Sequence, residues 1–148
     1  MPFTAPMKNT MCRAFNAASK AGCASWAHWV SDLEERLRLY FNALNAFDLK
    51  SVEAMFAEDA VYASSGLGAQ VTGRAEIMKA FRGYFAEYDD QVSIDEAVNL
   101  VGPKTFSSKW KLIATSNKTG MRINRSGTQI TEFNAAAMIA KIVVSDSA

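Results

Sequence analysis

Apolar residues recur at helical spacing directly after residue 30. The successive spacings are four, three, four and three, so one face of a helix carries the whole stripe. Its members are Leu33, Leu37, Tyr40, Leu44 and Phe47. Ser31 and Glu34 match a capping box, in which the serine oxygen accepts a hydrogen bond from a free amide and the glutamate reaches back. The pattern predicts a helix that begins at Ser31 and buries this stripe.

Two further helices are expected before the middle of the chain. Asp48 is placed to cap a short helix, and Thr72 and Gly73 begin a longer one. The inward face of the longer helix consists of Ile77, Phe81 and Phe85. Between the two helices, the segment 60–64 is expected to form a strand, and the small residues around 66–68 are expected to form a loop at a pocket mouth.

The second half of the chain alternates apolar and polar residues with a period of two, as strands with two different faces do. The segment 92–101 places Glu96 on the apolar face with Ile94 and Val98, and it puts Asp95 on the polar face. We therefore expect Glu96 to point inward. The alternatives are that a bulge rotates this strand, or that its start projects beyond the helices and leaves Glu96 in water.

Three more strands are expected after it. The alternation in the segment 105–116 sends Trp110 to one face and Lys109 to the other. Turns over 117–120 and 134–137 separate this strand from the two that follow. Three helices followed by an antiparallel meander predict an α+β fold.

The length and composition fit one globular domain, since 49% of the 148 residues are hydrophobic and 21% are charged. No apolar run approaches the ~20 residues that cross a bilayer, and no secretory signal is evident. The expected location is cytoplasmic, with no membrane partner. Residues 1–30 are basic and lack acids, which fits either an organelle-targeting leader or an N-terminal arm. A single domain is expected over 31–148.

The expected domain lacks the residues that several kinds of catalytic and binding site require. The one histidine, His28, and both cysteines, Cys12 and Cys23, precede the expected domain, which argues against a catalytic triad and a zinc site. No phosphate-binding motif is present, so neither a metal nor a cofactor is expected. The net charge is only +1. Trp110 also faces away from Lys109, which argues against nucleic-acid binding.

The segment from Tyr40 to Ala60 resembles the start of ketosteroid isomerases at matching spacing, and weaker similarity continues through Gly73, Phe133 and Asn134. The region from about residue 32 to 145 is thereby similar to the nuclear transport factor 2-like superfamily, which includes ketosteroid isomerases and polyketide cyclases. The resemblance implies a cone-like, curved antiparallel sheet wrapped around a pocket that three N-terminal helices cover. It also implies a homodimer through the sheet face.

The resemblance further implies where catalytic groups would lie. Such enzymes use a carboxylate base on the first strand, with a tyrosine and a protonated acid that donate hydrogen bonds to the developing enolate oxygen. Tyr40 falls at the tyrosine position, Gln129 at the second donor and Ser64 at the base. An amide can donate as a protonated carboxyl does, whereas a neutral serine cannot act as the base. Glu96 is therefore the candidate base.

The pocket is expected to bind an apolar ligand that bears a carbonyl or hydroxyl, in a cavity of roughly 300 Å³ or more. The candidate catalytic residues are Tyr40, Glu96 and Gln129. The candidate ligand-binding residues are Tyr62, Ser64, Trp110, Thr131 and Phe133. An isomerase, cyclase or lyase activity stays open, because Tyr40, Tyr62 and Trp110 can equally be core aromatics. The alternative is a non-catalytic dimerisation or protein-interaction module with the same fold.

Overall fold

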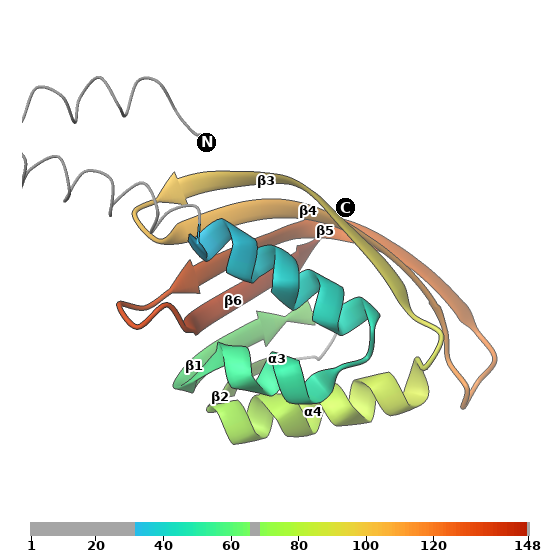
Figure 1. The fold of residues 1–148 in the computed structure, drawn as a ribbon. Coiled ribbons are helices and arrows are strands. Elements are labelled where there is room, and N and C mark those ends of the chain that lie inside the picture. Colours follow the sequence, from blue (N-terminus) through green and yellow to red (C-terminus); the bar gives the residue numbers. More distant parts are fainter. Residues whose placement is uncertain (1–31, 66–68, 148) are drawn as a thin grey trace, which may run out of the picture. The chain divides into compact units, whose positions relative to one another are not determined.

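A computed structural model describes residues 32–65 and 69–147 of the chain (Figure 1). The expected leader or arm over 1–30, the expected N-cap at Ser31 and the expected loop over 66–68 lie outside the described residues. The chain divides into two compact units, Met1–Arg36 and Leu37–Ala148. Of the first unit, the structure describes only the helical residues 32–36. The sheet and the other helices belong to the second unit.

The helices form where capping and apolar spacing predict them. The first runs over residues 32–45, α3 over Leu49–Met55 and α4 over Arg74–Glu87. Asp48 caps α3, since its carboxylate accepts hydrogen bonds from the Ser51 N–H at 3.2 Å and from the Ser51 hydroxyl at 2.6 Å. The inward residues of α4 are buried, as predicted. None of the described helices is long and apolar enough to span a membrane.

The described strands form one mixed, curved sheet that is not closed, with the order β2-β1-β6-β5-β4-β3. The strands are β1 (Phe56–Ser64), β2 (Ala69–Thr72), β3 (Val92–Gly102), β4 (Thr105–Thr115), β5 (Arg122–Phe133) and β6 (Ile139–Asp146). Neighbouring strands are antiparallel except β1 and β6, which pair in parallel. The α+β class is confirmed, and the sheet is mixed rather than wholly antiparallel.

The first part of the sheet differs from the sequence expectation at both of its strands. β1 begins at Phe56, directly after α3, four residues before the expected strand over 60–64, and its Glu58 and Asp59 lie exposed. β2 occupies residues 69–72, a segment too short for its alternation of apolar and polar residues to indicate a strand. It forms because β1 offers an edge, with Val61 opposite the last residue of β2.

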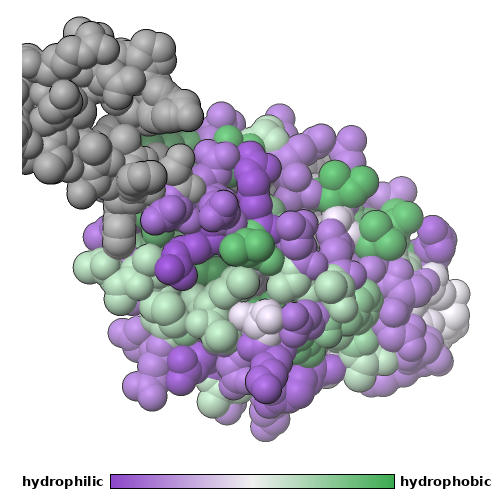
Figure 2. All heavy atoms as spheres, viewed as in Figure 1, coloured by the Kyte–Doolittle hydropathy of each residue, from purple (hydrophilic) through white to green (hydrophobic). Residues whose placement is uncertain are grey.

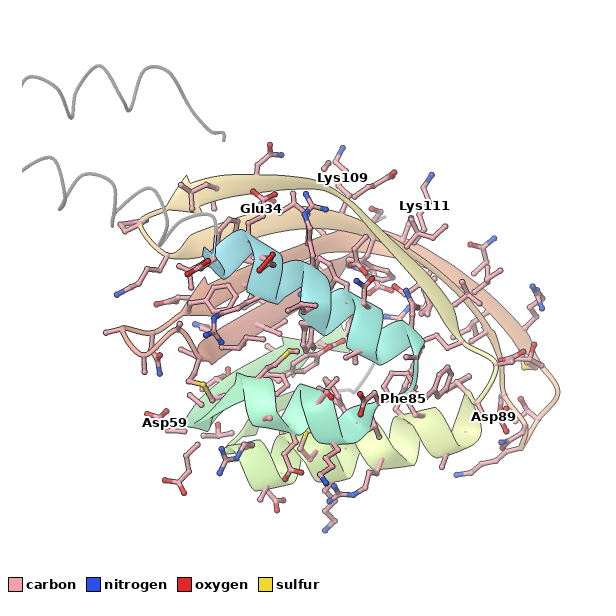
Figure 3. All side chains as sticks on the ribbon, viewed as in Figure 1. Glu34, Asp59, Phe85, Asp89, Lys109 and Lys111 are labelled. Atoms are coloured by element: carbon pink, nitrogen blue, oxygen red, sulfur yellow. The ribbon has the colours of Figure 1, made fainter. Side chains whose placement is uncertain are left out.

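The helices and the sheet enclose an aromatic core. Residues 37–45, α3 and α4 lie on one side of the curved sheet (Figure 1). The Phe81 ring meets the rings of Phe56 and Tyr62 edge to face, at centroid distances of 6.0 and 5.0 Å. Lys109 and Lys111 point away from the helices (Figure 3). In the view of Figure 2, strongly hydrophobic residues form separate spots among hydrophilic ones.

Candidate ligand-binding site

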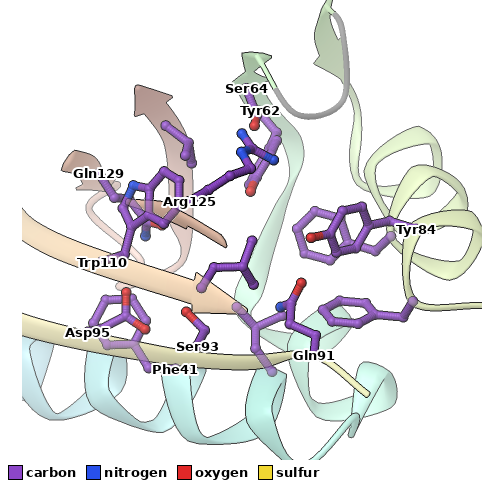
Figure 4. Close-up of a pocket in the computed structure, with 15 residues that line it drawn as sticks. Phe41, Tyr62, Ser64, Tyr84, Gln91, Ser93, Asp95, Trp110, Arg125 and Gln129 are labelled. Carbon is purple, nitrogen blue, oxygen red and sulfur yellow. The ribbon is translucent and has the colours of Figure 1, made fainter. Parts of the chain in front are cut away.

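A cavity lies between the helices and the inner face of the sheet (Figure 4). Its volume is about 100 Å³, well below the expected 300 Å³. The apolar and aromatic wall consists of Phe41, Leu44, Tyr62, Phe81, Tyr84, Phe85, Trp110, Leu112 and Val144. The polar wall consists of Ser64, Gln91, Ser93, Asp95, Arg125 and Gln129. Apolar walls with a few polar groups are typical of small-molecule sites.

The structure brings together part of the predicted site. Among the predicted residues, those that line the cavity are Tyr62, Ser64, Trp110 and Gln129. Tyr40, Thr131 and Phe133 are buried but do not line it. Glu96 is exposed and does not line it either.

The expected inward orientation of Glu96 is wrong, and its neighbour Asp95 lines the cavity instead. β3 is an edge strand whose apolar residues face outward, with Ile94 57% exposed. A bulge follows at Ala97, which has a φ of 53°, and the pairing with β4 shifts there. The polar face of this strand forms part of the cavity wall. On β3, therefore, polar side chains point inward and apolar side chains point outward, the reverse of the usual arrangement.

A signal in the sequence could have found Asp95. In the register of β3 and β4, Asp95 lies opposite Trp110, and directly opposed residues share one face of a sheet. Trp110 was correctly expected to face inward, and it is buried. Pairing the two strands before assigning faces would have turned Asp95 inward and Glu96 outward.

Asn45 fixes the start of β3. Its side-chain Nδ2 donates to the Ser93 carbonyl oxygen at 2.7 Å, and its Oδ1 accepts from the Ser93 N–H at 2.9 Å. The amide thus acts as a one-residue strand partner for an otherwise free edge. Since Asp95 is two residues further along, the clamp also orients the carboxylate toward the cavity.

The cavity raises the pKa of Asp95 to about 6, from an ordinary value of 3.8. Burial is the main cause, and a hydrogen bond from Ser93 acts weakly in the opposite direction. A carboxyl with this pKa is present in both its acidic and its basic form near neutral pH, which suits a general acid or base. Such shifts are frequent at functional sites.

Tyr40 lies fully buried behind the cavity wall, in contact with the rings of Phe41 and Phe56. Its hydroxyl has no hydrogen-bond partner among the described residues. Burial raises its pKa well above 10.0, and the charges of Tyr62 and Asp95 raise it further. A buried hydroxyl without a protein partner keeps its donor available for another group.

Two other polar groups at the cavity differ in their hydrogen bonding. Gln129 donates through Nε2 to the Thr131 hydroxyl at 3.0 Å, so its amide donor is used within the protein. The indole nitrogen of Trp110 has no partner among the described residues. The Trp110 ring crosses β5 at Gly127, where a Cβ atom would lie 2.8 Å from Trp110 Cζ2.

Arg125 and Asp146 form an ion pair at the edge of the cavity. Arg125 Nε and Nη2 donate to the two Asp146 oxygens at 2.8 and 2.7 Å. The guanidinium carbon lies 5.6 Å from the centre of the Trp110 ring. Ser65 donates to Asp146 at 2.8 Å.

Among residues 32–65 and 69–147, no group of three or more His, Cys, Asp or Glu is placed to bind a metal ion.

Comparison with protein families identifies one match. A family described as the SnoaL-like domain matches residues 37–142, most of the chain. No curated protein sequence matches the chain.

Solved structures share the fold at low sequence identity. An NTF2-like protein of unknown function from Exiguobacterium sp. 255-15 is 19% identical, with a TM-score of 0.66 over 76% of this chain and 98% of that one. A Mycobacterium tuberculosis protein in complex with estradiol-17β-hemisuccinate is 16% identical, with a TM-score of 0.65 over 74% and 88%. SalBIII, an epoxide hydrolase/cyclase-like enzyme with a role in pyran ring formation in the polyether salinomycin, is 16% identical. Its TM-score is 0.70, over 79% of this chain and 92% of that one.

Proposed function

This chain belongs to the SnoaL-like domain family of the nuclear transport factor 2-like superfamily, and we propose that its cavity binds a small, largely apolar ligand that bears a carbonyl or hydroxyl. The observation that carries this proposal is that Asp95 lines an aromatic-walled cavity, behind which the Tyr40 hydroxyl lies buried without a partner among the described residues. The structural neighbours include a steroid complex and a cyclase-like enzyme, which supports a ligand of this kind.

The chemistry that we propose for this site is proton transfer at a carbon next to a carbonyl, as in an isomerase, cyclase or lyase. Asp95 takes the proton, the electron pair moves onto the carbonyl oxygen, and Tyr40, which lies buried behind the cavity wall, donates a hydrogen bond to that oxygen once the ligand has displaced the wall side chains. Protonated Asp95 then returns the proton to another atom of the ligand. Asp95 replaces Glu96 in this role, and Ser64 lines the cavity without acting as a base.

Ligand titration followed by NMR tests this proposal. The small aromatic ketone 4-hydroxyacetophenone is expected to shift the resonances of the cavity wall saturably. Tyr40→Phe should weaken this binding by about 0.5 to 1.5 kcal/mol, because it removes one hydrogen bond to the ligand. Fold stability should change little, since the hydroxyl has no partner within the described protein. Equal binding by both proteins would remove Tyr40 from the site.

A second candidate function is a non-catalytic dimerisation module, which the small cavity volume favours. The outer face of β3 and β4 carries apolar side chains, with Val92 opposite Ile113 in the register and Ile94 nearby. We propose a homodimer through this face. Light scattering should show a monomer for Ile94→Lys and an unchanged dimer for Leu39→Lys, whose side chain is equally exposed on a helix. A monomeric parent protein would contradict the dimer.

The cytoplasmic location and the lack of nucleic-acid and membrane partners stay predictions.

A further inference from the structure

Arg125 presents an incompletely used guanidinium to the cavity. Two of its N–H groups, on Nε and Nη2, donate to Asp146, whereas a guanidinium carries five N–H donors. None of the described residues accepts a hydrogen bond from Nη1. The side chain lines the cavity and stacks near the Trp110 ring, so its orientation is fixed while donors remain free.

Two tyrosines line the same cavity as this guanidinium. Burial raises the pKa of Tyr62 and Tyr84, that of Tyr84 to about 12, and the charge of Arg125 acts in the opposite direction. Both tyrosines are therefore neutral near pH 7 and can donate. In Figure 4, Arg125 and Tyr62 lie on one side of the cavity, while Asp95 and Ser93 lie on another. The cavity thus has hydrogen-bonding groups on two separate walls.

The charge of Arg125 is balanced. Asp146 engages the guanidinium at two atoms, and the side chains of the pair are only 23% and 35% exposed. The ion pair as a whole has no net charge, and a carboxylate brought to the guanidinium would meet the negative Asp146 at close range. It can still donate to an uncharged oxygen.

We propose that Arg125, Tyr62 and Tyr84 form a second oxygen-binding subsite, on a different wall from Asp95, and that Asp146 restricts this subsite to uncharged oxygens. This inference rests on the proposed ligand binding in the same cavity. It narrows the ligand class to apolar compounds with two uncharged oxygen functions, one at Asp95 and one at Arg125. Asp146 is then a specificity-determining residue that need not touch the ligand.

Three related compounds test the subsite on the full-length protein by calorimetry at neutral pH. The first is 4-hydroxyacetophenone, which has two uncharged oxygens. Acetophenone lacks the hydroxyl, and 4-acetylbenzoate carries a carboxylate in place of the hydroxyl. The parent protein should bind 4-hydroxyacetophenone several-fold more tightly than acetophenone. It should also prefer 4-hydroxyacetophenone to 4-acetylbenzoate by about tenfold or more, because the carboxylate meets Asp146.

Asp146→Asn keeps a hydrogen-bond acceptor for Arg125 but removes the balancing charge. The preference for 4-hydroxyacetophenone over 4-acetylbenzoate should fall by about fivefold or more in this variant. Glu132→Gln is the matched control, since it removes one acid from the outer face of β5, where the side chain is exposed. Its preference should equal that of the parent.

The possible outcomes separate the two proposals. If the compounds bind but Asp146→Asn leaves the preference unchanged, the subsite proposal is overturned and the ligand-binding proposal stands. If none of the compounds binds the parent protein, both proposals are overturned. If Asp146→Asn does not fold, the order of the three affinities in the parent protein decides. Binding of 4-acetylbenzoate as tight as that of 4-hydroxyacetophenone then overturns the subsite.

Discussion

Replacing Asp95 with Asn is expected to stabilise the fold at neutral pH. Burial raises the pKa of the Asp95 carboxyl from 3.8 to about 6, so the folded protein resists ionisation that the unfolded chain accepts readily. Between these two values the folded state binds more protons than the unfolded state, and stability therefore decreases as pH rises. Above about pH 7 the full penalty is present. Asparagine fills nearly the same volume and never ionises.

The magnitude follows from the size of the shift. A change of about two pKa units corresponds to roughly 3 kcal/mol, because each unit is worth about 1.4 kcal/mol. Solvent still reaches part of this side chain, so about 2 kcal/mol is a better expectation. The gain of Asp95→Asn over the parent protein should grow mainly between about pH 4 and about pH 7.

Denaturant unfolding of both proteins across this pH range measures the effect. Asp48, Asp90 and Asp146 have lowered pKa values, so their contributions are lost in more acidic solution, but they are common to both proteins and cancel in the difference. Glu96→Gln is the matched control, because Glu96 is the exposed neighbour on the same strand. It should not give the gain in stability that Asp95→Asn gives at neutral pH. The reasoning is refuted if Asp95→Asn is less stable than the parent at neutral pH, or if the difference does not vary with pH.

Three further predictions concern the support of the site. Asn45→Ala should lower the free energy of unfolding by about 1–2 kcal/mol, because two hydrogen bonds to β3 are lost. Urea unfolding measures this loss, and an equal loss in the exposed control Asn42→Ala would contradict the prediction. Gly127→Ala should cost about 1–3 kcal/mol or more, because the added Cβ would overlap a β6 carbonyl oxygen and approach Trp110; an unchanged melting temperature would contradict it. Deleting residues 1–30 should leave a folded domain, and loss of the cooperative thermal transition would show that these residues belong to the core.

The fold could be predicted well from the sequence, because its main signals are local. The Asp48 cap and the apolar face of α4 depend on residues within a few positions of one another. The parallel pairing of β1 with β6 could not be predicted in this way, since it joins Phe56 to Ile139 across most of the domain. β2 was missed because its pairing depends on the β1 edge rather than on its own composition.

The site could be predicted only in part. Inward residues on the central strands, such as Trp110 and Gln129, obey the rule that buried positions alternate. That rule fails on β3, where the wall of the cavity is polar and the outward face is apolar, so it selected Glu96 instead of Asp95. The ion pair of Arg125 with Asp146 joins two strands through their register, which sequence alternation alone does not give.

The most direct test of the central claim is the pKa of the Asp95 carboxyl, followed by carbon-13 NMR in the free protein and with saturating 4-hydroxyacetophenone. The account predicts a midpoint of about 6 in the free protein. It also predicts a further rise with the ligand, because a neutral compound displaces water from the carboxylate. A midpoint close to the ordinary value of 3.8, unchanged by the ligand, would contradict both the burial of Asp95 and its place in a ligand-binding cavity.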